Sequence, residues 1–144
     1  MAALQAGWRT GDLHLITAGA RRLAGLGPGL TPAGDDLLVG WLAGIFFFGE
    51  RSNLGVRAAA VGQAAAATAA ARTTRLSAAW LRHAGVGEFA EPWHQLAAGL
   101  GTGDPTVVAQ AAHRILNTGA TSGQEAMRGF LHARRLFDTP DLSV

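Results

Sequence analysis

The segment of this 144-residue chain best suited to chemistry is a glycine-rich run that ends in two adjacent carboxylates. It reads GLGPGLTPAGDD over residues 25–36 and leads directly into an apolar stretch of helical character. Glycines bare backbone N–H groups, and the N-terminus of a helix attracts anions. We therefore predict a site for a carboxylate or phosphate here, formed by Gly27, Gly29, Thr31 and Gly34. The run lacks the third glycine of a dinucleotide-binding fingerprint, and the chain has no lysine for a P-loop.

The paired carboxylates, Asp35 and Asp36, are the candidate catalytic residues. They fall in the first turn of the predicted helix, where the helix dipole favours negative side chains. Three interpretations stay open: dipole complementarity alone, contact with a metal or with a cationic or amide group of a substrate, and general-base catalysis. Neighbouring helical residues point about 100° apart, so we expect one of the two, rather than both, to act on a ligand.

A second cluster interrupts the helical pattern and consists of Thr73, Thr74, Arg75 and Ser77. Hydroxyl groups and a guanidinium in such a break can bind an oxyanion. The alternative is ordinary capping of the helix that follows, since threonine is a favoured N-cap residue.

A third cluster, Thr121, Ser122 and Gly123, precedes the last predicted helix. Ser122 with Glu125 matches a capping box, in which the serine caps the helix and the glutamate reaches back. The alternative is again an anion site at a helix N-terminus. We expect the starts of the three helices to surround one cleft.

Several kinds of chemistry are excluded by composition. The chain has no cysteine, lysine or tyrosine, so thiolate, Schiff-base and phenol chemistry are unavailable. Its five histidines include no pair at helical spacing, so we expect no histidine-based metal site, and the sequence does not identify a cofactor. The net charge is only +2 and the arginines are scattered, so we expect no nucleic-acid partner. Trp93 can line a cleft, although most tryptophans should be core residues.

The elements that must position these clusters are predicted to be helices throughout. We expect an all-α fold, a single compact domain over residues 1–144 with six or seven helices around a central apolar helix, Leu37–Phe48. Gly40 and Gly44 should let another backbone approach that helix closely. Asp12, Ser52 and Asp104 are predicted N-caps. The longest uncharged apolar run, residues 37–49, is shorter than the roughly 20 residues that span a bilayer, so we expect no membrane segment. The N-terminus has no signal-peptide pattern, which favours the cytoplasm.

Three segments together resemble the AllH-like family: GLGPGLTPAGDD over residues 25–36, TTRLSAAWLRHAGVGE over 73–88, and NTGATSGQEAMRG over 117–129. The chain looks like the C-terminal portion of longer family members. It has Ala120 and Glu125 where members often have His and Asp. The family is linked to a subunit of a microbial oxamate carbamoyltransferase in allantoin breakdown.

The resemblance implies carbamoyl transfer between an oxalurate-type ureido acid and phosphate. Asp35 or Asp36 would then orient the carbamoyl N–H₂ group, and Arg75 would help the three helix starts hold a small anionic substrate. It also implies partner subunits or a homo-oligomer. The alternative is a non-catalytic module that binds a small molecule or assists assembly.

Overall fold

All regular structure in the described part of the chain is α-helical. The computed structural model describes residues 1–138, which form eight helices and no strand. Their bounds are α1 Ala2–Thr10, α2 Leu13–Leu23, α3 Ala33–Arg51, α4 Gly55–Ala70, α5 Arg75–Gly85, α6 Glu91–Thr102, α7 Pro105–Leu116 and α8 Ser122–Arg134. The all-α prediction is confirmed. Helix α1, whose Leu4 and Trp8 are fully buried, was not predicted.

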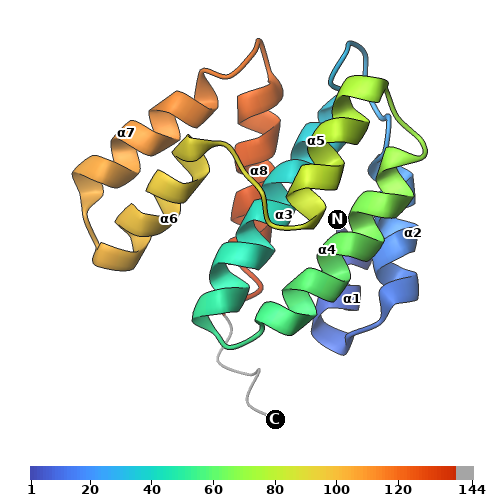
Figure 1. Cartoon of the computed structure of the whole chain (residues 1–144), viewed down its shortest axis with the longest axis horizontal. Coiled ribbons are helices and arrows are strands. Elements are labelled where there is room, and N and C mark those ends of the chain that lie inside the picture. The colour runs from blue at the N-terminus through green and yellow to red at the C-terminus, as the bar shows by residue number, and fades with distance from the viewer. Residues whose placement is uncertain (139–144) are drawn as a thin grey trace.

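The central helix is α3, as predicted, and it packs against α8, α4, α5 and α2 (Figure 1). Its contact with α8 is the most extensive in the molecule. A Cβ atom added at Gly40 would lie 1.7 Å from the carbonyl oxygen of Ala126 in α8. One added at Gly129 of α8 would lie 1.9 Å from the carbonyl oxygen of Leu37. The two backbones therefore touch because these glycines have no side chains, which confirms the expected close approach at Gly40.

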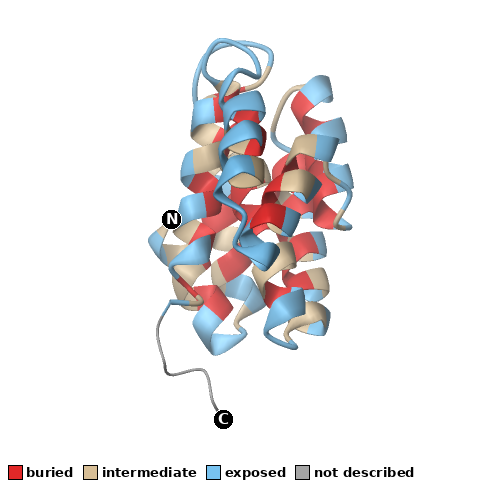
Figure 2. Ribbon diagram, turned by 90° about the vertical axis from the view of Figure 1, so that its left-hand side faces the viewer, coloured by how far each residue is buried: buried red, intermediate tan, exposed pale blue. Residues whose placement is uncertain are grey.

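Buried residues are found along most of the helices (Figure 2). The hydrophobic ones form two clusters that share α3 and α8. The larger cluster joins α1, α2, α4 and α5 to α3 and the end of α8. The smaller one joins α6 and α7 to α3 and α8, through Ala43, Trp93, Leu96, Ala111, Ile115, Ala126 and Phe130. Helices α6 and α7 form a hairpin to one side of the larger cluster (Figure 1). The space between α5 and this hairpin is where the candidate site lies.

Local capping explains where several helices begin. Asp12 caps α2, and its carboxylate accepts the backbone N–H of His14 at 2.8 Å. Asp104 caps α7 in the same way and accepts the backbone N–H of Thr106 at 2.9 Å. The prediction that Ser52 caps the next helix is wrong, because α3 continues to Arg51 and Ser52 ends it. Helix α4 begins only at Gly55.

The lengths of the helices and the end of the last one complete the description of the fold. Within residues 1–138, no helix has the length and apolar character that a bilayer crossing requires. Helix α8, the last one described, ends at Arg134. The frayed tail that the sequence predicts after Thr139 and Pro140 lies outside the described residues.

Candidate functional site

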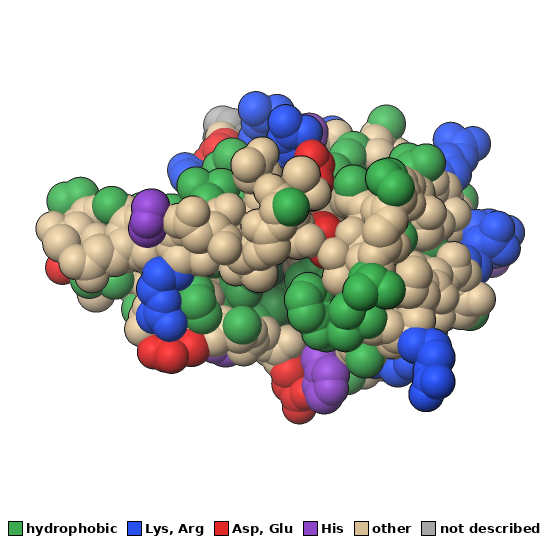
Figure 3. Space-filling model, turned by 90° about the horizontal axis from the view of Figure 1, so that it is seen from above, with side chains coloured by type: hydrophobic (Ala, Val, Ile, Leu, Met, Phe, Trp, Pro, Cys, Tyr) green, Lys and Arg blue, Asp and Glu red, His purple; other side chains and the backbone are tan. Residues whose placement is uncertain are grey.

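A half-open cavity of about 500 Å³ lies between α5, the α5–α6 connection and α6 on one side and α3, α7 and α8 on the other. Viewed from above, the surface is hollowed where hydrophobic side chains gather (Figure 3). The lining is mainly apolar: Val39, Trp80, Ala84, Phe89, Ala90, Pro92, Trp93, Ile115 and Ala126, together with Gly123. Its polar members are Asp36, His83, Glu88, Thr118 and Ser122. This size and this lining are typical of sites for small molecules.

Asp36 brings a buried carboxylate to the cavity from the first turn of α3. The residue is 4% exposed, and its Oδ2 atom has no hydrogen-bond partner within residues 1–138. Burial raises the pKa of Asp36 from 3.8 to about 6, while the hydroxyls of Ser122 and Thr31 oppose this rise and the charges of Asp35 and Glu125 add to it. The carboxyl group can therefore exist in both protonation states close to neutral pH.

Two hydroxyls lie beside Asp36, those of Thr31 and of Ser122, and Ser122 was predicted to cap its own helix. Thr31 Oγ1 and Ser122 Oγ lie 2.9 Å apart and share a hydrogen bond. The N-cap residues are instead Pro32 for α3 and Thr121 for α8, neither with a side-chain capping bond. The predicted capping box is therefore wrong, and Glu125 forms an ion pair within α8. The loop before α3 brings Thr31 to the start of α8, and this tertiary partner replaces the local one.

Asp35, the neighbouring carboxylate, is occupied by other parts of the chain. It is 1% exposed. Its Oδ1 accepts the backbone N–H of Gly25 at 2.9 Å, and its Oδ2 accepts the hydroxyl of Thr73. Asp35 thus ties the glycine-rich loop to the turn between α4 and α5, and it does not line the cavity.

The second cluster lies against the same loop. The hydroxyl of Thr74 donates to the carbonyl of Leu30 at 2.6 Å and accepts the N–H of Ser77 at 3.2 Å, so Thr74 caps α5 and also holds the loop. Ser77 is 2% exposed, and its Oγ has no partner among the described residues. Arg75 is exposed and does not line the cavity.

Three helix starts do meet at the glycine-rich loop, through the Thr31–Ser122 and Thr74–Leu30 bonds. The loop itself, residues 25–34, lies outside the cavity lining. Gly27 and Gly29 have positive φ angles of 115° and 96°, so they allow the turn.

Gly34 and Gly123 have packing roles that the sequence does not reveal. A Cβ atom at Gly34 would lie 2.1 Å from the carbonyl oxygen of Leu23, and one at Gly123 would lie 1.9 Å from that of Ile115. The N–H of Gly123 donates to the carbonyl of Thr118 at 2.9 Å. Gly123 lines the cavity, but its N–H is already paired. Of the third cluster, Ser122 therefore offers the polar group at the cavity, while Thr121 is exposed.

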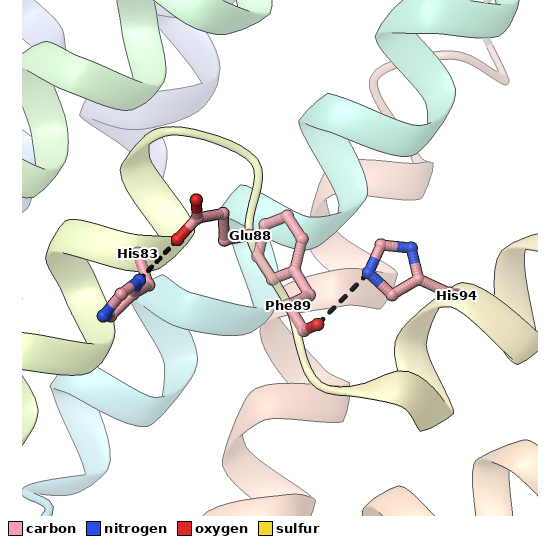
Figure 4. Close-up of polar contacts among 4 residues, drawn as sticks. All are labelled: His83, Glu88, Phe89 and His94. Carbon is pink, nitrogen blue, oxygen red and sulfur yellow. Dashed lines mark hydrogen bonds and ion pairs between the residues drawn. The ribbon is translucent and has the colours of Figure 1, made fainter.

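Several lining residues were not identified from the sequence as site residues. Trp80 and His83 lie on α5, and Glu88 and Phe89 lie in the connection to α6. His83 Nδ1 lies 2.5 Å from Glu88 Oε2 (Figure 4). A search for histidine pairs could not find this contact, because the partner is a carboxylate beyond the end of the helix. Trp93 does line the cavity, as the sequence allowed.

Figure 4 also shows how the connection is held on its other side. His94 Nε2 lies 3.1 Å from the backbone carbonyl oxygen of Phe89, and the His94 ring packs against that of Phe47. A histidine of α5 and a histidine of α6 thus contact two adjacent residues of the connection, Glu88 and Phe89. Glu88 and Phe89 of the connection are therefore in contact with both α5 and α6.

Comparison with known proteins identifies one family. The family model described as "Oxamate carbamoyltransferase subunit AllH" matches residues 23–134. This range covers most of the chain, all three clusters and every residue that lines the cavity. No solved structure matches the chain.

Proposed function

Since this chain belongs to the AllH family, we propose that it binds the ureido acid in an oxamate carbamoyltransferase and holds the carbamoyl end of that substrate at Asp36. One observation carries the proposal: Asp36 is a buried carboxylate in a mainly apolar cavity, and its Oδ2 has no partner in residues 1–138. An unsatisfied buried acceptor is costly, and a carbamoyl N–H₂ group offers two donors. A bound carbamoyl group would therefore recover that cost.

The chemistry requires positioning more than a covalent nucleophile. An oxygen of HPO₄²⁻ attacks the carbamoyl carbon of oxalurate, and the bond from that carbon to the inner amide nitrogen breaks. The phosphate proton passes to the departing nitrogen, which gives oxamate and carbamoyl phosphate. Asp36 would fix the orientation of the carbon through the N–H₂ group, and Ser122 places a hydroxyl beside it.

The anionic parts of the substrates need cations that the described lining lacks. It contains two carboxylates, Asp36 and Glu88, and one histidine, but no arginine. Bound carboxylate and phosphate groups are usually held by arginine or by several N–H donors. We therefore propose that the other subunits of the enzyme complete the site, with Arg75 and the glycine-rich loop available at the adjoining surface.

The test is to reconstitute the enzyme with its other subunits and to measure carbamoyl phosphate formed from oxalurate and phosphate. Asp36→Asn should lower the rate at least tenfold, which corresponds to about 1.4 kcal/mol. Glu50→Gln, an exposed carboxylate near the far end of α3, is the matched control and should retain the wild-type rate. Wild-type activity of Asp36→Asn would refute the proposal.

The second candidate is a non-catalytic binding or assembly subunit, which the absence of arginine from the described lining favours. The same assay separates the two, because the other subunits can be tested without this chain. Full activity of the other subunits without this chain would establish the non-catalytic role. If activity is lost without this chain and adding the Asp36→Asn variant does not restore it, the non-catalytic role is excluded.

A further inference from the structure

The cavity is larger than the substrate of the proposed reaction. Oxalurate has nine non-hydrogen atoms and displaces about as much volume as four or five water molecules, roughly 150 Å³ at about 30 Å³ each. The cavity measures about 500 Å³. More than half of this space would stay unfilled by oxalurate alone.

Aromatic rings line the cavity from three consecutive elements. Trp80 comes from α5, Phe89 from the connection and Trp93 from α6. The ring centroid of Phe89 lies 5.4 Å from that of Phe47, and the ring centroid of Trp93 lies 5.4 Å from that of Phe130. Two of the three rings are thus held by aromatic neighbours behind them. Trp80 is 42% exposed and lies at the more open part of the lining.

The polar groups of the cavity call for a ligand that donates hydrogen bonds. His83 and Glu88 pair with each other, and both side chains are about two-thirds exposed. Asp36 is the buried polar group, and it presents acceptor oxygens. When this chain is alone, a ligand that carries a negative charge would meet this carboxylate without an arginine in the described lining to balance it.

We propose that the cavity binds a planar ligand whose paired N–H donors, of the amidine or urea type, face Asp36 and whose flat apolar body lies against Trp80, Phe89 and Trp93. This inference rests on the proposed function in one respect, because it also places the N–H donors of the ligand at Asp36. It differs in naming ligands that are larger molecules than oxalurate. Aromatic faces add attraction when the donor edge is cationic. They stack equally on a neutral flat ring.

The first experiment is calorimetric titration of the full chain at pH 7.5 with four small probes. Benzamidine and phenylurea combine a donor edge with a ring, guanidinium has the edge alone, and benzoate has the ring with an anionic edge. We expect benzamidine or phenylurea to bind at least tenfold more tightly than both guanidinium and benzoate. Any other ranking overturns the proposal. The order of benzamidine and phenylurea shows whether the preferred donor edge is charged.

The second experiment assigns the two ends of the ligand to residues. Asp36→Asn should weaken the better ring probe at least tenfold, and Trp80→Ala should weaken it at least fivefold while guanidinium affinity stays unchanged. Trp80→Leu keeps an apolar side chain without the ring and covers the case in which Trp80→Ala does not fold. Glu50→Gln, the control on α3, should bind like the wild type. Unchanged affinity in either tryptophan variant that folds would contradict the stacking.

The outcomes also separate this inference from the proposed function. Correct probe ranking with unaffected carbamoyl transfer in Asp36→Asn would leave the ligand class standing and refute the reaction. Loss of carbamoyl transfer in Asp36→Asn together with a wrong probe ranking would support the proposed reaction and refute the ligand class.

Discussion

On one side of the first turn of α3, Asp35 faces the glycine-rich loop and the α4–α5 turn; on the other, Asp36 faces α8 and the cavity. Asp35 accepts one backbone N–H and one hydroxyl from distant parts of the chain. Asp36 has an oxygen without a partner within residues 1–138, and its pKa is raised to about 6. The two aspartates therefore differ in their hydrogen bonds: both oxygens of Asp35 accept bonds from the protein, whereas Oδ2 of Asp36 accepts none within residues 1–138. An acceptor that the fold leaves unused is available to a ligand.

The same difference has opposite consequences for stability. Hydrogen bonds to a charged acceptor contribute about 1.5–3 kcal/mol each, so Asp35 should stabilise the fold. A raised pKa means that folding disfavours the charged form of Asp36, so its ionised carboxylate should destabilise the fold.

The largest effect is expected for Asp35→Ala. The substitution leaves the N–H of Gly25 and the hydroxyl of Thr73 without their acceptor and removes two charge-assisted bonds. We expect a loss of about 3–5 kcal/mol in the free energy of unfolding, measured by urea denaturation. A loss below about 1 kcal/mol would show that the two sides of the turn are equivalent.

Asp36→Asn should act in the opposite direction. The folded-state pKa of about 6 exceeds the ordinary value of 3.8, so the folded protein binds more protons than the unfolded chain between these values. Stability from protonated Asp36 is complete below about pH 3.8 and is lost as the pH rises through about 6, a change of at most about 3 kcal/mol. The asparagine variant should lack this loss and gain about 1–3 kcal/mol over the wild type at pH 8.

The measurement is urea denaturation of both proteins at several pH values from 4 to 8. Asp35 and Glu125 also influence Asp36, and His83 and Glu88 line the same cavity, so the informative quantity is the difference between the two proteins at each pH. A difference that does not change with pH would contradict the raised pKa.

Ser122→Ala should have a smaller effect on stability but a visible one on the carboxylate. The Ser122 hydroxyl lowers the pKa of Asp36, so its removal should raise that pKa further above 6. The free energy of unfolding should fall by about 1 kcal/mol, because the bond with Thr31 is lost. Carboxyl carbon NMR titration measures the pKa. Thr121→Ala is the control and should leave it unchanged, since Thr121 is exposed and makes no side-chain capping bond.

The smallest effect is expected at the edge of the cavity. Glu88→Gln removes the charge that pairs with His83, and both side chains are about two-thirds exposed. Exposed ion pairs contribute between 0 and about 1 kcal/mol, so the melting temperature should change little. A loss above about 2 kcal/mol would show that this pair holds the α5–α6 connection in place.

Features set by local chemistry could be predicted from the sequence. The central helix follows from an apolar run, the start of α2 from Asp12, and the close approach of another backbone, though not its identity as α8, from the missing side chain of Gly40. Helix α1 was missed, because Leu4 and Trp8 alone make a weak pattern around a glycine, Gly7.

The candidate site was predicted in part. Asp36 and Ser122 were identified from their types and positions, and both line the cavity. Their hydrogen-bond partners could not be predicted, because a capping rule considers one helix and Thr31 reaches the start of another. The aromatic wall was missed for a similar reason: Trp80 and Phe89 become neighbours of Asp36 only after α5 packs against α3.

The glycine contact between α3 and α8 has a consequence for the proposed site. Asp36 and Ser122 belong to these two helices, and backbone atoms that touch at Gly40 and Gly129 leave little freedom for either helix to slide or turn. The spacing of the two polar groups is therefore preorganised by the main chain. If the proposed function is correct, a substrate between Asp36 and Ser122 would spend no binding energy on arranging them, and that energy would stay available for the transition state.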